Sequence, residues 1–194
     1  VACRLRGEPP PKWIGEVRTH SASVTPGDLF VAVPGHRHDG TAYIAEAVRR
    51  GARVIVTETA VGPEALGAGI TWVQVPSARA ALSRLAANRY GHPSRQLVTV
   101  GITGTTGKTT TGLLLHHLLQ AAGWRAGLVG SLGVWTGRRR LPGRLTTPDP
   151  LDLHAYLREM VEAGCQAVVM EVSSQGADQH RVDHVHFDLC VVTN

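Results

Sequence analysis

Residues 97–110 read LVTVGITGTTGKTT, an apolar run that passes through a glycine- and threonine-rich loop into Lys-Thr-Thr. The apolar run is typical of a strand that is buried on both faces of a parallel sheet. In such a loop the backbone N–H groups and the lysine face a polyphosphate, and the next hydroxyl binds Mg²⁺. The sequence therefore predicts a nucleotide–magnesium site, with Lys108 as a catalytic cation. Its predicted cofactor-binding residues are Gly104, Thr105, Thr106, Gly107, Lys108, Thr109 and Thr110.

The loop departs from the strict G-x-x-x-x-G-K-[ST] template at its first glycine, where this chain has Ile102. Gly104 and Gly107 leave a shorter G-x-x-G-K-T core. A plain turn that contains Gly and Lys is the alternative interpretation. The strand expected before the loop and the helix expected after it favour the phosphate site.

A second apolar run, AVVME at 167–171, ends on an acidic residue. This position is the carboxyl end of an expected strand, where open α/β sheets bind ligands. A carboxylate at the edge of a buried strand is costly unless it is paired, and a metal ion would pair it. We therefore predict Thr109 and Glu171 as magnesium ligands and Glu171 as catalytic, with a solvated strand-end acid as the alternative.

Short β-branched runs alternate with helical patterns along the whole chain. In the first half we expect strands at 28–33, 53–57 and 70–75 and helices at 41–50 and 78–90, capped by Asp39 and Ser77. In the second half we expect strands at 97–102, 126–134, 166–172 and 187–193 and helices at 109–122 and 151–163. The later helix pattern over 109–122 predicts a core of Leu113, Leu114, Leu118 and Leu119.

This order predicts an α/β fold in two parts. The helix breakers GHPS at 91–94 place a boundary between a small α/β domain over 1–92 and a P-loop-type parallel-sheet domain over 93–194. The sequence stops directly after an expected strand, which would leave apolar surface uncovered. We therefore expect the second domain to be truncated at its C-terminus.

Composition limits the classes of protein that remain. The chain has 194 residues, 43% apolar and 5% aromatic, with a formal net charge of +5. That apolar content excludes a disordered chain, the charge favours an anionic ligand, and the few aromatics argue against binding of single-stranded nucleic acid. Cys3, Cys165 and Cys190 lack the spacing of a disulfide framework or a zinc site. We expect a cytoplasmic monomer that binds neither nucleic acid nor membrane.

Four motifs follow one another in the chain: GITGTTGKTTT at 101–111, LTTPD at 145–149, MEVSSQGADQHRV at 170–182 and VVTN at 191–194. In this order they resemble the Mur ligase family, whose loop reads G-T-[NT]-G-K-T and so accounts for Ile102. The stretch PGDLFVAVPG at 26–35 resembles the UDP-binding domain of that family. The resemblance covers nearly the whole chain.

The resemblance implies an ATP- and Mg²⁺-dependent ligase of peptidoglycan biosynthesis. In the branch of the family that it indicates, the third amino acid is added to UDP-N-acetylmuramoyl-L-alanyl-D-glutamate through an acyl phosphate. The implied partners are this UDP-muramyl dipeptide and a free amino acid, and diaminopimelate, lysine and ornithine all stay open. Residues 1–92 would bind the UDP substrate and 93–194 would bind ATP.

The family's substrate contacts carry over position by position. Thr146 and Thr147 match a pair that contacts the muramyl peptide, and the pattern S-x-x-x-x-x-Q-x-R places Ser173, Gln179 and Arg181 beside them. Ser21, His36 and Arg37 occupy positions used around uridine and pyrophosphate. Taken alone, the threonines suit a helix-entry turn, Arg181 a surface charge and His36–Arg37 a solvated loop. The chain departs from the family at His20-Ser21-Ala22, where Asp-Ser-Arg is usual, and at Gln175, where His is common.

Other interpretations remain open from the sequence. A P-loop NTPase or small-molecule kinase with an appended binding domain is the main alternative, and a noncatalytic nucleotide-binding module is a third. In the family, a histidine motif, a carbamylated lysine and a C-terminal domain follow the position of Asn194, so we expect these 194 residues alone to be inactive in ligation. We interpret Arg138–Arg140 as an exposed charge run, and His184 and His186 as an exposed strand face, not a metal site.

Overall fold

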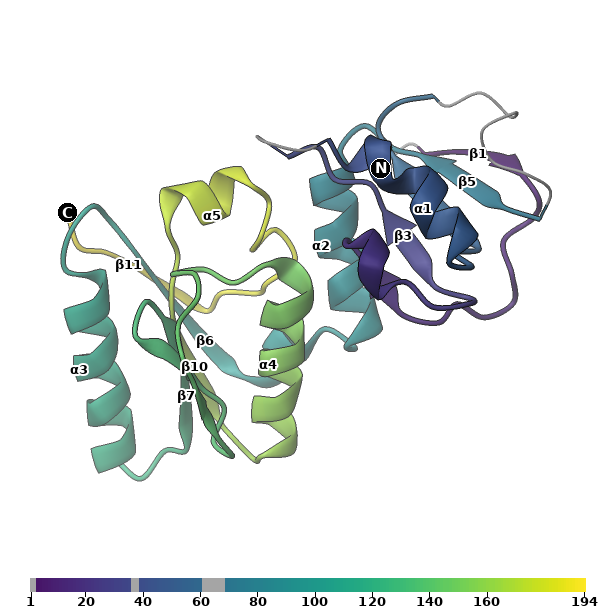
Figure 1. Cartoon of the computed structure of the whole chain (residues 1–194). Coiled ribbons are helices and arrows are strands. Elements are labelled where there is room, and N and C mark those ends of the chain that lie inside the picture. Colours follow the sequence, from purple (N-terminus) through teal and green to yellow (C-terminus); the bar gives the residue numbers. More distant parts are fainter. Residues whose placement is uncertain (1–2, 36–38, 61–68) are drawn as a thin grey trace. The chain divides into compact units, whose positions relative to one another are not determined.

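The computed structural model describes residues 3–35, 39–60 and 69–194 (Figure 1). The chain divides into two compact units, Val1–Leu82 and Ser83–Asn194. The division falls within helix α2, Ala78–Arg89. The boundary after residue 92 stays a prediction.

The first unit is built on a five-stranded sheet in the order β1-β5-β4-β3-β2. Only β1 runs antiparallel, against β5, and the other pairs are parallel. Phe30, Ile55 and Trp72 are its largest fully buried side chains. The three expected strands are present, whereas β1 and β2 were not predicted. The elements are β1 Arg4–Gly7, β2 Val17–Arg18, η1 Ser21–Ser23, β3 Leu29–Val31, η2 Gly40–Tyr43, α1 Ile44–Arg49, β4 Val54–Thr57 and β5 Thr71–Gln74.

Both predicted helix caps of this part of the chain are present. The Asp39 carboxylate accepts a hydrogen bond from the N–H of Thr41 at 2.9 Å, and the Ser77 hydroxyl accepts one from the N–H of Ala80 at 3.2 Å. The helix expected over 41–50 begins as the 3₁₀ turn η2 and becomes α-helical only at Ile44.

The second unit contains a six-stranded sheet in the order β11-β6-β10-β7-β8-β9. The first four of these strands are parallel, which confirms the expected parallel-rich α/β fold. No helix of the described chain has both the length and the apolar content that a membrane crossing needs. The elements are η4 Pro93–Gln96, β6 Val98–Thr103, α3 Lys108–Ala121, β7 Ala126–Gly130, β8 Gly133–Trp135, β9 Arg140–Leu141, α4 Pro150–Glu162, β10 Ala167–Glu171, α5 Ser174–Asp178 and β11 Leu189–Val192.

The single strand predicted over 126–134 is wrong. Two antiparallel strands, β7 and β8, occupy this stretch and are joined by a turn at Ser131 and Leu132. Gly133 has a φ of +137°, a conformation that other residues rarely adopt, and this glycine lets the chain reverse direction. The turn therefore brings Ser131 to the carboxyl end of the parallel strands.

Helices α3 and α4 cover opposite faces of this sheet (Figure 1). Val169 of β10 packs with residues of α3, whereas its neighbours Val168 and Met170 pack with Leu153, Leu157 and Met160 of α4. Successive side chains of a strand point to opposite faces, so an uninterrupted apolar strand serves both helices.

The predicted core of α3 is half wrong. Leu114 and Leu118 are 58% and 55% exposed, and the buried positions of this helix are Gly112 and His116. Nε2 of His116 lies 3.0 Å from the Ala126 carbonyl oxygen, and burial lowers the pKa of this histidine. Leucines occupy several faces of the helix, so their spacing does not identify the inward one.

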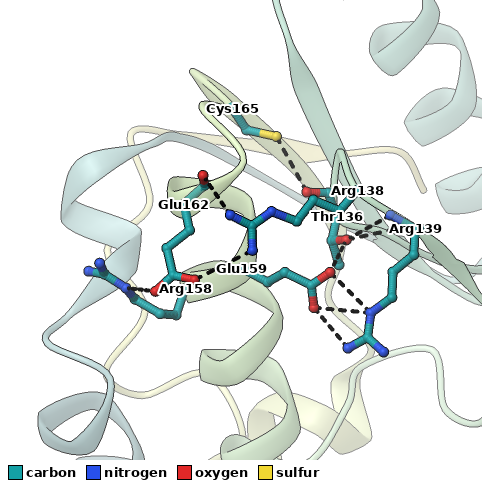
Figure 2. Close-up of polar contacts among 7 residues, drawn as sticks. All are labelled: Thr136, Arg138, Arg139, Arg158, Glu159, Glu162 and Cys165. Carbon is teal, nitrogen blue, oxygen red and sulfur yellow. Dashed lines mark hydrogen bonds and ion pairs between the residues drawn. The ribbon is translucent and has the colours of Figure 1, made fainter.

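The arginines at 138–140 are exposed, as predicted, and Arg138 and Arg139 are paired with glutamates of α4 (Figure 2). Arg139 makes a bidentate contact with Glu159 of α4, whose carboxylate also accepts a hydrogen bond from Thr136 at 2.6 Å. Arg138 contacts both the carbonyl and the carboxylate of Glu162, and the guanidinium of Arg140 lies 4.3 Å from the Trp135 ring centroid. These contacts fasten the turn after β8 to α4.

Replacing Glu159 with Gln tests this network. The hydrogen bond from Arg139 lowers the pKa of Glu159, so the pair contributes stability above the ordinary value of 4.5 and loses it as pH falls through the lowered pKa. We expect E159Q to reduce the free energy of unfolding at pH 7 by about 1 kcal/mol, since the arginine is largely in solvent. The difference from the wild type should shrink below pH 4.5. The control is E162Q, because the Glu162 side chain is 46% exposed and that of Glu159 only 17%. Urea titrations should show a smaller loss of stability for E162Q than for E159Q.

His154 supplies a separate test of pH dependence. Its side chain is fully buried in α4, neither ring nitrogen has a hydrogen-bond partner in the described chain, and burial lowers its pKa to about 4. Stability should be complete above about pH 6.5, the ordinary pKa, and fall by at most about 3 kcal/mol toward pH 4. His154→Leu should flatten this slope in thermal unfolding, whereas the exposed His117→Leu should retain it. An unchanged slope in the first variant would contradict the assignment.

Candidate functional site

The predicted phosphate loop connects β6 to α3 in the second unit. Gly104 and Gly107 have φ values of +132° and +85°, which only glycine adopts without strain. A Cβ at Gly104 would also overlap the Thr193 hydroxyl. That hydroxyl donates to the Thr106 carbonyl at 2.6 Å, and the Thr105 N–H donates to the Asn194 carbonyl at 2.8 Å. The residues after β11 therefore hold the loop in shape.

The start of α3 is open to an anion. Its N-cap residue, Gly107, supplies no side-chain cap, in contrast to α5, where the Ser173 hydroxyl accepts from the N–H of Gly176 at 3.0 Å. The first N–H groups of a helix have no intrahelical acceptors and carry partial positive charge. A phosphate group at this terminus would satisfy them.

The Lys108 ammonium group lies over the same loop. Its Nζ donates to the carbonyls of Gly104 at 2.7 Å and Thr105 at 3.2 Å. These two bonds leave one of the three ammonium protons for a ligand. The lysine is therefore placed as a compact positive charge beside the open helix terminus.

Glu171 is the buried acid of this region. The residue is only 3% exposed and ends β10, the strand next to β6. Oε2 accepts a hydrogen bond from the Thr109 hydroxyl at 3.0 Å, and no lysine, arginine or histidine pairs with it in the described parts of the chain. A desolvated carboxylate without a cation is costly, and a divalent cation between Glu171 and Thr109 would remove that cost. The donor set of one carboxylate and one hydroxyl is that of magnesium in a nucleotide site.

Sequence reasoning did not find Ser131 and Gly130, which complete the surroundings of Glu171. The N–H of Ser131 donates to Oε1 at 3.0 Å and its hydroxyl to Oε2 at 3.3 Å. A Cβ at Gly130 would overlap the carboxylate, so this glycine leaves room for Glu171 in its present position. The pair Gly130-Ser131 is a turn signal, but the expectation of one strand over 126–134 concealed it.

The two predicted substrate threonines point to different surroundings. The Thr146 hydroxyl is half-buried and lies 2.9 Å from that of Ser131. The Thr147 side chain is 1% exposed, accepts a hydrogen bond from the N–H of Ser173 at 3.0 Å and donates to the Glu171 carbonyl at 3.2 Å. Thr147 thus joins the 145–149 segment to the corner after β10. A substrate contact by either side chain stays a prediction.

Ser173, Gln179 and Arg181 lie beside this segment. Arg181 donates to the Thr147 carbonyl and to Oε1 of Gln179, each at 2.7 Å, and its Nε is 3.2 Å from the Asp149 carboxylate. The Nε contact has the distance of an ion pair but no hydrogen-bond alignment. The structure brings these three predicted residues together, and their contact with substrate stays a prediction.

The predicted uridine contacts belong to the first unit. Ser21 is 7% exposed and its hydroxyl donates to the Glu46 carboxylate at 2.7 Å, a bond that lowers the pKa of Glu46. His36 and Arg37 lie outside the described residues. The assignment of all three to the substrate stays a prediction.

The histidines after α5 form no metal centre. Among residues 3–35, 39–60 and 69–194, no group of three His, Cys, Asp or Glu side chains has the geometry to hold a metal ion. His184 and His186 lie outside any strand, so the predicted strand alternation is wrong. All three cysteines are free, with Cys165 buried and Cys190 exposed.

Two family models match the chain. The Mur ligase family catalytic domain matches residues 14–90, and the Mur ligase middle domain matches residues 102–194. These matches place the phosphate loop and Glu171 in the second domain and Ser21 in the first.

Several curated proteins are similar over most of the chain. The UDP-N-acetylmuramoyl-L-alanyl-D-glutamate–2,6-diaminopimelate ligase of Pseudomonas aeruginosa is 44% identical over 93% of this chain and 37% of its own length. The ligase of the same name from Chlorobaculum tepidum is 42% identical over 100% of this chain and 38% of its own length. The chain therefore spans little more than a third of these relatives.

Solved structures share the fold. A structure of a ligase with that same name has a TM-score of 0.75 at 23% identity, covering 93% of this chain and 36% of that one. MurF ligase from Thermotoga maritima, solved in complex with ADP, has a TM-score of 0.57 at 27% identity, covering 91% of this chain and 36% of that one.

Replacing Lys108 with Ala tests the phosphate loop. We expect K108A to weaken binding of ATP about 100-fold, since a hydrogen bond to a charged group contributes roughly 1.5–3 kcal/mol. The chain has one other lysine, Lys12, and K12A is the matched control that should leave the affinity unchanged. Isothermal titration calorimetry measures both. Equal affinities of K108A and the wild type would contradict the loop's assigned role.

Proposed function

The chain belongs to the Mur ligase family, and from this premise we propose that its protein adds the third amino acid to UDP-N-acetylmuramoyl-L-alanyl-D-glutamate with hydrolysis of ATP. The names of the similar curated proteins support this substrate. The observation that carries the proposal is the buried Glu171 carboxylate, which lies beside Thr109 and the phosphate loop and pairs with no basic side chain of the described residues.

The reaction requires two displacements at one end of the sheet. An oxygen of the substrate carboxylate attacks the γ-phosphorus of ATP and ADP leaves, which produces an acyl phosphate. The amine of the incoming amino acid then attacks the acyl carbon and phosphate leaves. Neither step needs a covalent bond to the protein, so the chain contributes positioning and charge neutralisation.

The residues of the second unit suit these two tasks. The free N–H groups of α3 would bind the β- and γ-phosphates, and Lys108 would stabilise the negative charge on the transferring phosphoryl group. Thr109 and Glu171 would hold magnesium, which neutralises phosphate charge when bound. The Thr109 hydroxyl oxygen already lies 3.0 Å from Oε2 of Glu171, so these side chains would need to move little to share a metal ion.

The muramyl peptide would lie along the neighbouring loops. The Arg181 side chain is only 13% exposed, and its guanidinium donates hydrogen bonds to the Thr147 carbonyl and to Oε1 of Gln179. A fixed guanidinium suits the carboxylate of a D-glutamyl group, and hydroxyls from Thr146 and Ser173 supply neutral hydrogen bonds. The net charge of +5 also favours a substrate that carries a diphosphate and carboxylates.

The incoming amino acid and the cellular location are supported more indirectly. Diaminopimelate is the amino acid named for the similar proteins of Pseudomonas aeruginosa and Chlorobaculum tepidum, which favours it over lysine or ornithine. Three free cysteines suit a reducing compartment, in keeping with a cytoplasmic enzyme. The monomeric state stays a prediction.

Binding of the UDP-muramyl dipeptide tests the proposal. At 100 times its Kd, this ligand should stabilise the chain by about 2.7 kcal/mol, seen as a rise in melting temperature. Arg181→Ala should weaken binding at least tenfold, because a hydrogen bond to a charged group contributes roughly 1.5–3 kcal/mol. Arg181→Lys, which keeps the positive charge, should lose less affinity for the dipeptide.

Arg158→Ala is the matched control for Arg181, because Arg158 is an exposed arginine of α4 that pairs only with Glu162 among the described residues. It should retain the affinity of the wild type. A melting temperature that does not respond to the dipeptide, but does respond to ATP, would favour a kinase or other NTPase over a muramyl-peptide ligase.

A further inference from the structure

Ser131 occupies a position between the two predicted subsites. It is the first residue after β7, and its N–H and hydroxyl both face Glu171, the expected magnesium ligand. On its other side, its hydroxyl lies 2.9 Å from that of Thr146, the expected peptide contact. Ser131 itself is exposed, so a ligand can approach this chain of hydroxyls.

The number of protons makes the directions of these hydrogen bonds depend on one another. A hydroxyl has one proton to donate, and an ionised carboxylate only accepts. Either hydroxyl can be the donor in the 2.9 Å contact between Ser131 and Thr146. In the arrangement in which Ser131 donates to Oε2 of Glu171 at 3.3 Å, Thr146 must donate to Ser131. The proton of Thr146 is therefore committed within the protein in this arrangement.

A ligand at Thr146 changes this arrangement. A carbonyl or carboxylate oxygen that accepts from Thr146 takes the proton that Ser131 was receiving. Ser131 then keeps its contact with Thr146 only by turning its own proton toward it, away from Glu171. Oε2 of Glu171 loses that hydrogen bond and gains a lone pair that is free for a cation.

The reverse path has the same consequence. A divalent cation bound to Oε2 of Glu171 replaces the hydrogen bond from Ser131. The Ser131 hydroxyl can then donate to Thr146, and the Thr146 hydroxyl can donate to a ligand. Each ligand thus favours the other, as linkage between two sites requires. The N–H of Ser131, 3.0 Å from Oε1, holds the carboxylate in place in either state.

We propose that Ser131 is a positioning residue whose hydroxyl links the two subsites, so that magnesium at Glu171 and a hydrogen-bond acceptor at Thr146 bind cooperatively. This inference rests on the proposed function, because it takes the acceptor to belong to the muramyl peptide. Ser131 acts through Glu171 and Thr146 and takes no part in bond formation.

Calorimetry of the full chain measures the coupling directly. The affinity for a nonhydrolysable ATP analogue is determined with and without UDP-muramyl dipeptide, in Mg²⁺ and in EDTA. We expect the dipeptide to tighten binding about fivefold in Mg²⁺ and to have no such effect in EDTA. Ser131→Ala, which keeps the N–H but lacks the hydroxyl, should bring the ratio close to one.

Three further variants separate linkage from a structural effect. Ser131→Thr restores a hydroxyl and should restore the ratio, and Leu132→Ala, an exposed neighbour in the same turn, should leave it unchanged. Thr146→Val removes the hydroxyl at the peptide side of the link and should also bring the ratio of nucleotide affinities, with and without dipeptide, close to one. The double variant Thr146→Val/Ser131→Ala should show no further loss of coupling.

The outcomes are distinct. Unchanged coupling in Ser131→Ala overturns the inference, as does equal weakening of nucleotide binding with and without the dipeptide, which indicates a structural role only. A wild-type chain that binds both ligands without coupling also overturns it and leaves the proposed function intact. A wild-type chain that fails to bind the analogue or the dipeptide overturns the proposed function, and the inference with it.

Discussion

The buried carboxylate of Glu171 is the constraint around which the second unit is arranged. Glu171 ends a central strand and is 3% exposed, a position in which an ionised group needs several donors or a metal ion. The donors come from the segments that follow two other strands. They are the hydroxyl of Thr109 in the first turn of α3, after β6, and the N–H and hydroxyl of Ser131 in the turn after β7. Parallel strands bring these segments together because their carboxyl ends share one edge of the sheet.

The same edge explains the glycines and the bracing of the phosphate loop. Gly130 leaves room for the carboxylate, and Gly104 leaves room for Thr193. Strand β11 pairs with β6 and carries Thr193 and Asn194 to the loop, where their hydrogen bonds fix its backbone. A loop that is already ordered loses less conformational entropy when it binds a phosphate group than a flexible loop would lose.

Local chemistry made part of this site predictable from the sequence. The loop residues 104–107 and the first residues of α3 come directly after β6, and Glu171 is the last residue of β10. Residue type and position along the strands together therefore predict their role. Ser131 was missed because the apolar run continues on both sides of it and the hairpin depends on the backbone freedom of Gly133. The leucines of α3 were misassigned for a related reason: Leu114 and Leu118 are apolar but face outward, while His116 is buried and bonded to the Ala126 carbonyl.

Thr146 and Thr147 show why a motif identifies a place more readily than a role. They are adjacent in the sequence and match the same family pair, yet Thr147 is 1% exposed and joins Ser173 to Glu171, whereas Thr146 faces Ser131 at 2.9 Å. Arg181 depends on the same threonine, because its guanidinium donates to the Thr147 carbonyl at 2.7 Å. A substitution at Thr147 would therefore displace Ser173 and Arg181, two predicted substrate contacts, without removing either side chain. Because the Thr147 side chain is buried, we attribute loss of substrate binding in such a variant to the displacement of these neighbours and not to the loss of a direct contact by Thr147.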